Sequence, residues 1–373
     1  MRLYSLLVGL WLAVGASVVV PAQAGAAPAD GAVLSTSALA AADLPSGAAR
    51  GVRLLYATRD QNGRPARSTG AVYFPRGAAP RGGWPVISWA HGTTGIAPQC
   101  APSLMTGRVQ DRDQPLIAAA LRHGYVVAAT DYAGAGAEAE YLGGRAAAHD
   151  VIDVVRAARD VDSGVGRRWV AVGHSQGGHA ALWATRLAPR YAPDLDVRGV
   201  VALAPYSQVS KIFSTIQRPG VPNLSVLNSY YGFALYLMSG LAHARPDVNP
   251  LGYLTPTGKR WLTTARTVCA GELANAMTTV APGTFYRTPV DGTAFVRALR
   301  DYADIPTTGW RRPILIQQGV LDPVIPAIGT QTLVDELRGG GAAVTMRTYP
   351  TDHGGVVPMA MGDTLAAVAG YFR

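Results

Sequence analysis

The chain has 373 residues, of which 49% are hydrophobic, 15% charged and 8% aromatic, and this composition suits a globular core and excludes a disordered protein. Its net charge is +9, but the arginines are scattered or paired, as in Arg167-Arg168, whereas nucleic-acid binding needs a clustered basic stripe. Two cysteines are too few for a disulfide-rich scaffold or a four-cysteine zinc site.

Residues 1–24 have the pattern of a secretory signal peptide. Arg2 gives a positive start, an apolar run extends from Leu6 to Val20, and Ala22-Gln23-Ala24 fits an A-x-A cleavage site. The run is short for a membrane span of about 20 residues, and small residues follow it at once. We therefore expect a secreted protein that is cleaved after Ala24 and has no integral membrane segment in its mature chain.

The segment after the cleavage site is predicted to lead into a hairpin. Residues 25–50 are rich in alanine, glycine, proline and serine, and we expect a flexible leader there. Two short β-type runs follow at 53–58 and 69–74, and the Asn62-Gly63 pair between them is a strong turn signal. A buried strand at 84–90 comes next.

Strands and helices are predicted to alternate through most of the remaining chain. The expected strands are 125–130, 169–172, 199–203, 313–317 and 344–349, and the expected helices are 114–123, 146–161, 178–187, 330–337 and 357–372. Nearly continuous apolar strands separated by helices indicate a mostly parallel sheet with helices on both faces. The predicted fold class is therefore α/β, with a core formed by residues 51–205 and 310–373.

Residues 206–309 break this alternation. A stretch of that length between two sheet strands is not a structureless loop, and it contains a run at 229–238 that is aromatic and apolar on every face. We expect an inserted, largely helical cap or lid. Its aromatic residues either form a small core of their own or line an apolar substrate cleft, and both can hold at once.

A serine within a Gly-x-Ser-x-Gly motif joins a predicted strand to a predicted helix. The motif runs from Gly173 to Gly177, with Ser175 at its centre and the required context on both sides. Glycines leave room for a strained turn, which presents the serine hydroxyl at the carboxyl edge of the sheet. There the helix dipole and the Gln176 N–H can stabilise an oxyanion. The competing interpretation is a glycine-rich turn with an incidental serine.

Two residues further along the chain fit the partners that a serine nucleophile needs. A hydroxyl requires a base and an orienting carboxylate, expected here in the order serine, acid, histidine, each just after a strand. Asp322 follows the strand at 313–317 and His353 follows the strand at 344–349, so both should lie at the same sheet edge as Ser175. Asp131 is the best alternative carboxylate, but it precedes the serine, and we expect it to be structural.

The loop after the strand at 84–90 is predicted to supply a second oxyanion donor. It reads His91-Gly92-Thr93-Thr94-Gly95, a variant of the His-Gly type. The backbone N–H of Thr93 is the first candidate and that of Thr94 the second. A mechanism built on these groups needs no metal and no organic cofactor.

The two cysteines are expected to pair. Export would place Cys100 and Cys269 in an oxidising compartment, which favours a disulfide over two free thiols. The alternative is two small buried hydrophobic residues. Neither cysteine is predicted to be catalytic, because no motif nearby supplies a base.

Together these motifs resemble the α/β-hydrolase superfamily, and within it the secretory lipase family of fungal extracellular lipases and their bacterial relatives. The resemblance rests on His91-Gly92-Thr93-Thr94-Gly95 with Cys100-Ala101-Pro102-Ser103, on Thr130-Asp131-Tyr132-Ala133-Gly134, on Gly173-His174-Ser175-Gln176-Gly177-Gly178, and on the Asp322 and His353 pair. It implies a helical cap before the strand of the acid, lipase or esterase activity, Ser175 as nucleophile with Asp322 and His353 as its partners, and a disulfide from Cys100.

The sequence thus predicts a secreted, lipase-like serine carboxylic-ester hydrolase. Its substrate would be a small-molecule ester or a lipid such as an acylglycerol, cleaved through an acyl-enzyme on Ser175, and contact with a lipid interface is compatible with this activity. An acyltransferase, a proline-selective serine peptidase on the same fold and a catalytically silent binding protein remain as alternatives. No nucleic-acid partner and no particular oligomeric state is predicted.

Overall fold

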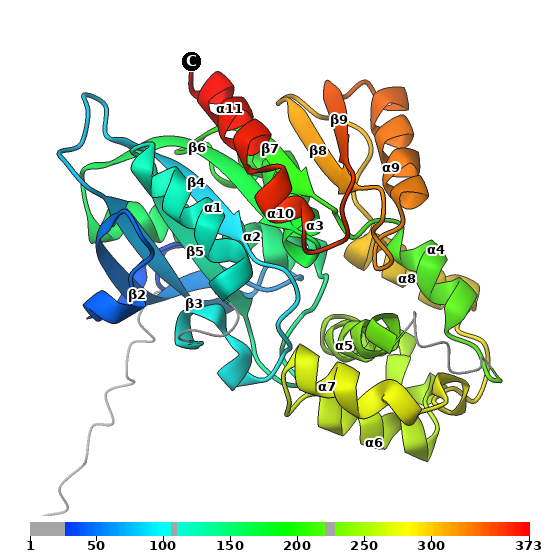
Figure 1. Cartoon of the computed structure of the whole chain (residues 1–373). Helices are drawn as coiled ribbons and strands as arrows, with labels where there is room; N and C mark the ends of the chain where they lie inside the picture. Colours follow the sequence, from blue (N-terminus) through cyan, green and yellow to red (C-terminus); the bar gives the residue numbers. More distant parts are fainter. Residues whose placement is uncertain (1–26, 106–109, 221–227) are drawn as a thin grey trace, which may run out of the picture.

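The computed structural model describes residues 27–105, 110–220 and 228–373 (Figure 1). The predicted signal peptide therefore lies outside the described residues. Among the helices of these three segments, none is long and apolar enough to cross a membrane.

The described residues form one sheet whose central and C-terminal strands are parallel. Its strands are β1 (Val33–Ala38), β2 (Ala48–Arg59), β3 (Pro65–Pro75), β4 (Trp84–Ala90), β5 (Val126–Ala133), β6 (Val165–His174), β7 (Asp196–Leu203), β8 (Ile314–Gly319) and β9 (Val344–Tyr349). They lie in the order β1-β2-β3-β5-β4-β6-β7-β8-β9. The pairs from β1 to β5 are antiparallel, and all neighbours from β5 to β9 are parallel.

Helices cover both faces of this sheet. The helices of the described residues, including those beside the sheet, are α1 (Gln110–Arg122), α2 (Gly144–Val161), α3 (Gln176–Tyr191), α4 (Val209–Ile216), α5 (Asn228–Ala244), α6 (Pro256–Ala265), α7 (Ala270–Ala276), α8 (Thr293–Ala303), α9 (Ala327–Gly339), α10 (Val356–Met359) and α11 (Met361–Phe372). Residues of α2, α3 and α9 share one apolar core with the sheet, and residues of α1, α10 and α11 share the other. Figure 1 shows α1 and α11 in front of the sheet and α2 and α3 behind it.

Strand β6 shows why the central strands are apolar throughout. Trp169 and Ala171 point into the core on the α2 and α3 side, whereas Val170 and Val172 point into the core on the α1 and α11 side. Because both faces are covered, both sets of alternating residues must be apolar. The prediction of a mostly parallel sheet with helices on both faces is confirmed.

The structure places secondary structure within residues 25–50, where the sequence predicts a flexible leader. Residues Val33–Ala38 form strand β1, which pairs antiparallel with β2, and Ala48 already belongs to β2. The composition of this segment is that of a loop because its residues are small and polar. An edge strand tolerates such residues, since it is held by backbone hydrogen bonds from one neighbour and buries little of its own surface.

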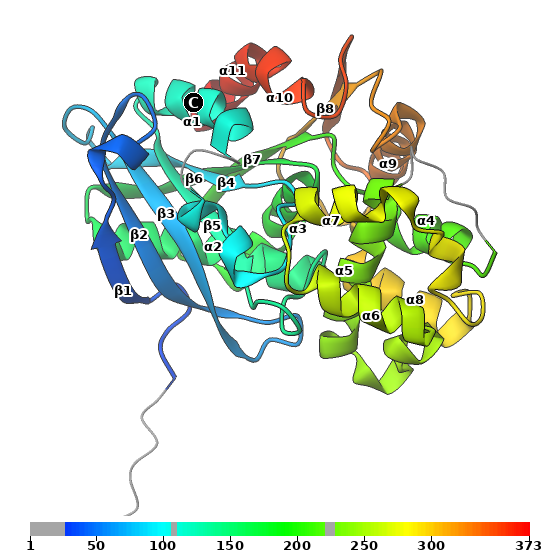
Figure 2. The ribbon, with the colours of Figure 1, turned by 60° about the horizontal axis from the view of Figure 1, so that its bottom comes forward.

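Between β7 and β8 the chain forms α4 to α8, which we call the cap. Figures 1 and 2 show α5, α6 and α7 gathered as a group beside the sheet. The apolar cluster of the cap, which includes Leu235 and Phe285, also contains residues from loops after strands: Ile96 after β4, Tyr141 after β5 and Ile325 after β8. The cap therefore packs over the carboxyl edge of the parallel sheet, and its aromatic residues form a core of their own that continues into these loops.

A disulfide joins the cap to the rest of the molecule. Cys100 and Cys269 are bonded, with Cα atoms 5.4 Å apart and a sequence separation of 169 positions. Cys100 lies in the loop after β4 and Cys269 directly precedes α7. The bond thus connects the cap to the loop in which the sequence predicts the second oxyanion donor.

Candidate active site

Ser175 occupies a strained turn between β6 and α3. Its backbone has φ 58° and ψ −117°, a conformation that residues other than glycine rarely adopt. The turn is held by the Ser175 N–H, which donates to the Leu203 carbonyl at 2.9 Å, and by the Ser175 carbonyl, which accepts from the N–H groups of His179 and Tyr206 at 3.1 and 3.2 Å. This geometry is the nucleophile elbow that a Gly-x-Ser-x-Gly motif forms between strand and helix.

The glycines on either side of Ser175 are required by close backbone contacts. A Cβ atom at Gly173 would stand 2.2 Å from the Gly177 carbonyl oxygen, and one at Gly177 would stand 1.8 Å from the Ala90 carbonyl oxygen. Neither contact allows a side chain, and both neighbours are backbone atoms that cannot rotate away. The spacing of the motif therefore follows from the packing of β4 against the start of α3.

Asp322 and His353 come together at the ends of β8 and β9. The His353 Nδ1–H donates to Asp322 Oδ2 at 2.7 Å, and the Asp322 side chain is fully buried. The other carboxylate oxygen, Oδ1, accepts from the N–H groups of Val324 and Ile325 at 2.8 and 2.7 Å. With Nδ1 acting as the donor, Nε2 of the imidazole is left as a proton acceptor.

His174 links the His353 loop to the serine turn, a contact that sequence reasoning missed. Its Nε2–H donates to the His353 carbonyl at 2.8 Å, and the two imidazole rings lie 4.6 Å apart. Because His174 directly precedes Ser175, the contact holds the His353 loop against the elbow. Within the described residues no hydrogen bond joins the Ser175 hydroxyl to His353, and such bonds are often loose before substrate binds.

The two predicted oxyanion donors lie in the loop after β4 and at the start of α3. Gln176 is the first residue of α3, so its N–H has no acceptor within the helix. Thr93 is fixed through its hydroxyl, which lies 2.7 Å from the Tyr141 hydroxyl. The same loop is supported by His91, whose ring packs 4.5 Å from the Tyr132 ring and whose carbonyl accepts from the Tyr132 hydroxyl at 3.0 Å.

A cavity of about 360 Å³ opens beside this region. Thr94 and Gln176 contribute to its wall, together with Ile96, Tyr141 and the disulfide cysteine Cys100. Its size is at the lower end of the range of small-molecule sites. The cavity therefore provides space for part of a ligand next to the first turn of α3.

The cap contacts the loop that carries the acid. The Tyr230 hydroxyl, from α5, donates to the Val324 carbonyl two residues after Asp322. No local sequence signal points to this contact, because the two residues are 94 positions apart. The orientation of the carboxylate loop therefore depends on the cap as well as on the sheet.

Asp131, the alternative carboxylate, and two further titratable residues next to the proposed site have other partners. Asp131 accepts from the Thr69 hydroxyl at 2.7 Å and from the Ser103 N–H at 2.9 Å, which fastens the loop after β4 to the sheet. Asp352 accepts from the Gly355 N–H at 2.8 Å. The His179 ring is buried and bonded to the Ala303 carbonyl at 2.6 Å, and burial lowers its pKa to about 4.

Comparison with known proteins gives a consistent set of relatives. A family model described as secretory lipase matches residues 99–369. A probable inactive lipase of Mycobacterium tuberculosis is 26% identical over 339 residues, covering 84% of this chain and 71% of that protein. Lipase A of Moesziomyces aphidis is 30% identical over 206 residues, covering 52% of this chain and 42% of that protein.

Solved structures with the same fold include lipases and esterases. Candida antarctica lipase A in its closed state has a TM-score of 0.75 and 22% identity, with 92% of this chain and 82% of that chain covered. The rice cell wall degrading esterase LipA from Xanthomonas oryzae has a TM-score of 0.70 and 19% identity, with 92% and 97% covered. At 22% and 19% identity, these similarities show a common fold and nothing more specific.

Proposed function

The chain belongs to the secretory lipase family and has the α/β-hydrolase fold, and from this premise we propose that it is a secreted serine carboxylic-ester hydrolase. The observation that carries the proposal is the buried Asp322, hydrogen-bonded to His353 at 2.7 Å in a loop held against the elbow of Ser175. This is the arrangement in which an imidazole can take a proton from a serine hydroxyl.

In the proposed reaction, Ser175 Oγ attacks the ester carbonyl carbon while His353 Nε2 takes the hydroxyl proton. Asp322 holds the imidazole tautomer and stabilises the imidazolium that forms. The N–H groups of Gln176 and Thr93 bind the carbonyl oxygen as it becomes negative. His353 then gives its proton to the leaving alcohol. Water, deprotonated by His353, attacks the acyl-enzyme, and His353 returns this proton to Ser175 Oγ as the acid is released.

An ester substrate is supported by the surroundings of the elbow and by the relatives. The cavity of about 360 Å³ adjoins Gln176, so we propose that it receives part of the ester. Relatives are named lipases, and another is named a probable trichothecene esterase. Secretion is supported by the signal-peptide pattern of residues 1–24, by the disulfide and by the description of the family.

The test is labelling and turnover of the purified protein. We expect a fluorophosphonate probe to label Ser175 and a series of p-nitrophenyl esters to be hydrolysed. Ser175→Ala should lose labelling and at least about 10³-fold in turnover, whereas Ser214→Ala, a serine on the cap helix α4, should lose neither. A folded wild-type protein that neither reacts with the probe nor hydrolyses any ester would place it with the relative named inactive and overturn the proposal.

A further inference from the structure

We propose that a divalent transition-metal cation, with Zn²⁺ as the test case, binds at the junction of core and cap on Asp60, Glu140 and His243. One ligand atom from each of these side chains lies within 4.8 Å of the other two. Asp60 is in the turn between β2 and β3, Glu140 in the loop between β5 and α2, and His243 in the last turn of α5. None of them takes part in the proposed ester hydrolysis.

Glu140 provides an independent observation that favours a cation here. The residue is only 9% exposed, and its Oε2 accepts from the Gln61 N–H at 2.6 Å. Its Oε1 is buried and has no hydrogen-bond partner among the described residues. A buried carboxylate oxygen without a partner is costly, and a cation at this position would satisfy it.

The ligand atoms of the three side chains indicate which class of metal can bind. Two carboxylate oxygens and one imidazole nitrogen are ligands that Zn²⁺ accepts, whereas Ca²⁺ prefers oxygen alone. Bonds of about 2 Å place the ligands of a tetrahedral ion roughly 3.3 Å apart, so ligand atoms that now lie within 4.8 Å of one another need to draw together by at most about 1.5 Å. The carbonyl end of α5 adds a favourable negative potential beside His243.

The cation that now neutralises Asp60 is readily displaced. Arg64 Nε pairs with Asp60 Oδ2 at 2.6 Å, but the arginine side chain is 60% exposed. Because the arginine side chain is exposed to solvent, this ion pair contributes little and can be given up when a divalent ion binds. The backbone remains in place, because the Asn62 amide donates to the Ala244 carbonyl at 3.0 Å and holds the turn against the end of α5.

A bound ion would therefore tie three segments together. The turn between β2 and β3 and the loop that carries Glu140 belong to the core, and α5 belongs to the cap. We expect the ion to stabilise the docking of the cap and to leave the chemistry at Ser175 to the side chains already described. In this respect it would act as a structural site.

The experiment uses the full, untagged protein after treatment with EDTA. Calorimetric titration with Zn²⁺ should show one equivalent bound, Co²⁺ should give the visible absorption of a low-symmetry site, and Zn²⁺ should raise the thermal midpoint. His243→Gln and Glu140→Gln should each weaken binding at least about tenfold. His243 is half-exposed, so its variant keeps the test valid even where Glu140→Gln folds poorly.

Two further histidine variants serve as controls. His123→Gln changes an exposed histidine just after α1, and His353→Gln removes the imidazole of the proposed active site. Both should bind Zn²⁺ as the wild type does. Absence of binding, binding unchanged in His243→Gln, or loss of binding in His353→Gln instead would each overturn the proposal.

Discussion

Asp322 accepts hydrogen bonds from four groups in the part of the chain that the structure describes. Val324 and Ile325 donate through their backbone N–H groups, and Gln318 and His353 donate through their side chains. A carboxylate that is fully buried needs such partners, since burial without them is costly. The four bonds fix its orientation, so the remaining freedom in the proposed catalytic set lies in His353 and in the loop that carries it.

His174 is the side chain that restrains this loop. We predict that His174→Ala lowers kcat for p-nitrophenyl butyrate about ten- to a hundredfold with little change in KM, because a misplaced base slows the chemical step more than binding. His174→Gln keeps an N–H donor for the His353 carbonyl and should restore much of the rate. Equal losses in both variants, or a loss explained by KM alone, would argue against this positioning role.

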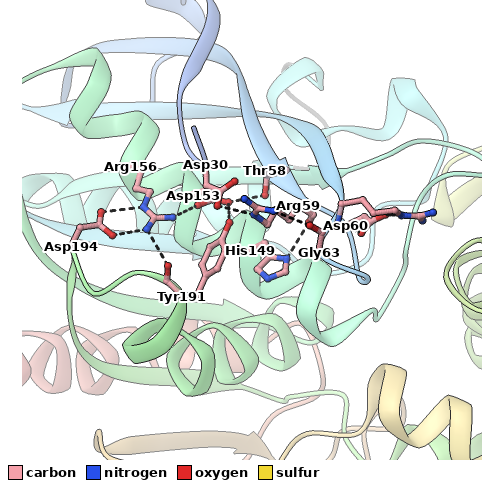
Figure 3. A network of polar contacts seen from close by, with 11 residues as sticks. Asp30, Thr58, Arg59, Asp60, Gly63, His149, Asp153, Arg156, Tyr191 and Asp194 are labelled. Carbon is pink, nitrogen blue, oxygen red and sulfur yellow. Dashed lines mark hydrogen bonds and ion pairs between the residues drawn. The ribbon is translucent and has the colours of Figure 1, made fainter. Parts of the chain in front are cut away.

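The helices behind the sheet are joined by a polar network as well as by their apolar core. Asp153 of α2 accepts from Thr58 of β2 at 2.9 Å, from Tyr191 of α3 at 2.7 Å and from Arg156 at 2.9 Å (Figure 3). Arg156 also pairs with Asp194. One buried carboxylate thereby connects a strand and two helices, and all of its donors point toward it in Figure 3.

We predict that Tyr191→Phe lowers the free energy of unfolding by about 1.5–3 kcal/mol. The substitution removes one hydrogen bond to a buried carboxylate and keeps the ring that packs 5.1 Å from the Arg156 guanidinium. Urea denaturation followed by circular dichroism measures the change. Tyr125→Phe is the matched control, because the Tyr125 hydroxyl has no hydrogen-bond partner among the described residues, and it should change stability by less than about 0.5 kcal/mol. Similar losses in both variants would contradict the assignment.

The loop between β5 and α2 makes stability depend on pH through Glu140. Burial raises the pKa of this carboxyl from its ordinary 4.5 to about 7 in the folded state. The folded protein therefore holds the proton more tightly than the unfolded chain. The stability that this provides is complete below about pH 4.5 and is lost as the pH rises through about 7. Asp60 adds to this shift, whereas Arg64 and the Gln61 N–H oppose it.

We predict that Glu140→Gln becomes the more stable protein as the pH rises, when both are measured in EDTA. The glutamine stays neutral, so its advantage over the wild type should grow by about 2–3 kcal/mol between about pH 5 and pH 9. Urea denaturation across this pH range gives the difference directly. A difference that does not vary with pH would show that Glu140 titrates alike in the folded and unfolded chain.

Considering the whole molecule, the sequence is most informative where its signals are local. The apolar run of β6 followed by the glycines around Ser175 predicts both an element and its turn, because the steric demands act between near neighbours. The positions of Asp322 and His353 follow from the rule that parallel strands end at the same edge. By contrast, the sequence does not predict β1, because its residues are mostly small and polar and an edge strand needs little apolar surface.

Contacts between distant segments leave no such signal. His174 reaches a carbonyl 179 residues away, and Tyr230 reaches one 94 residues away. Asp60, Glu140 and His243 meet only because the cap docks on the core. The sequence around each of these residues does not indicate its partner, because the partner is determined by packing in three dimensions. Prediction from sequence therefore reaches the proposed nucleophile, acid and base, but not the residues that hold them in position.

The disulfide is the one covalent cross-link between side chains of the cap and the core in the described chain, and it lies beside the predicted oxyanion loop. We predict that Cys100→Ala with Cys269→Ala lowers the free energy of unfolding by about 2–5 kcal/mol, because the unfolded chain is no longer constrained. At assay temperatures well below the thermal midpoint of the double variant, its activity should fall only a few-fold. The reason is that the Ala270 N–H still donates to the Thr94 carbonyl at 2.8 Å. Urea denaturation and ester hydrolysis measure the two effects, and wild-type protein treated with dithiothreitol should reproduce both. Loss of activity at full stability would mean instead that the bond mainly positions the oxyanion loop.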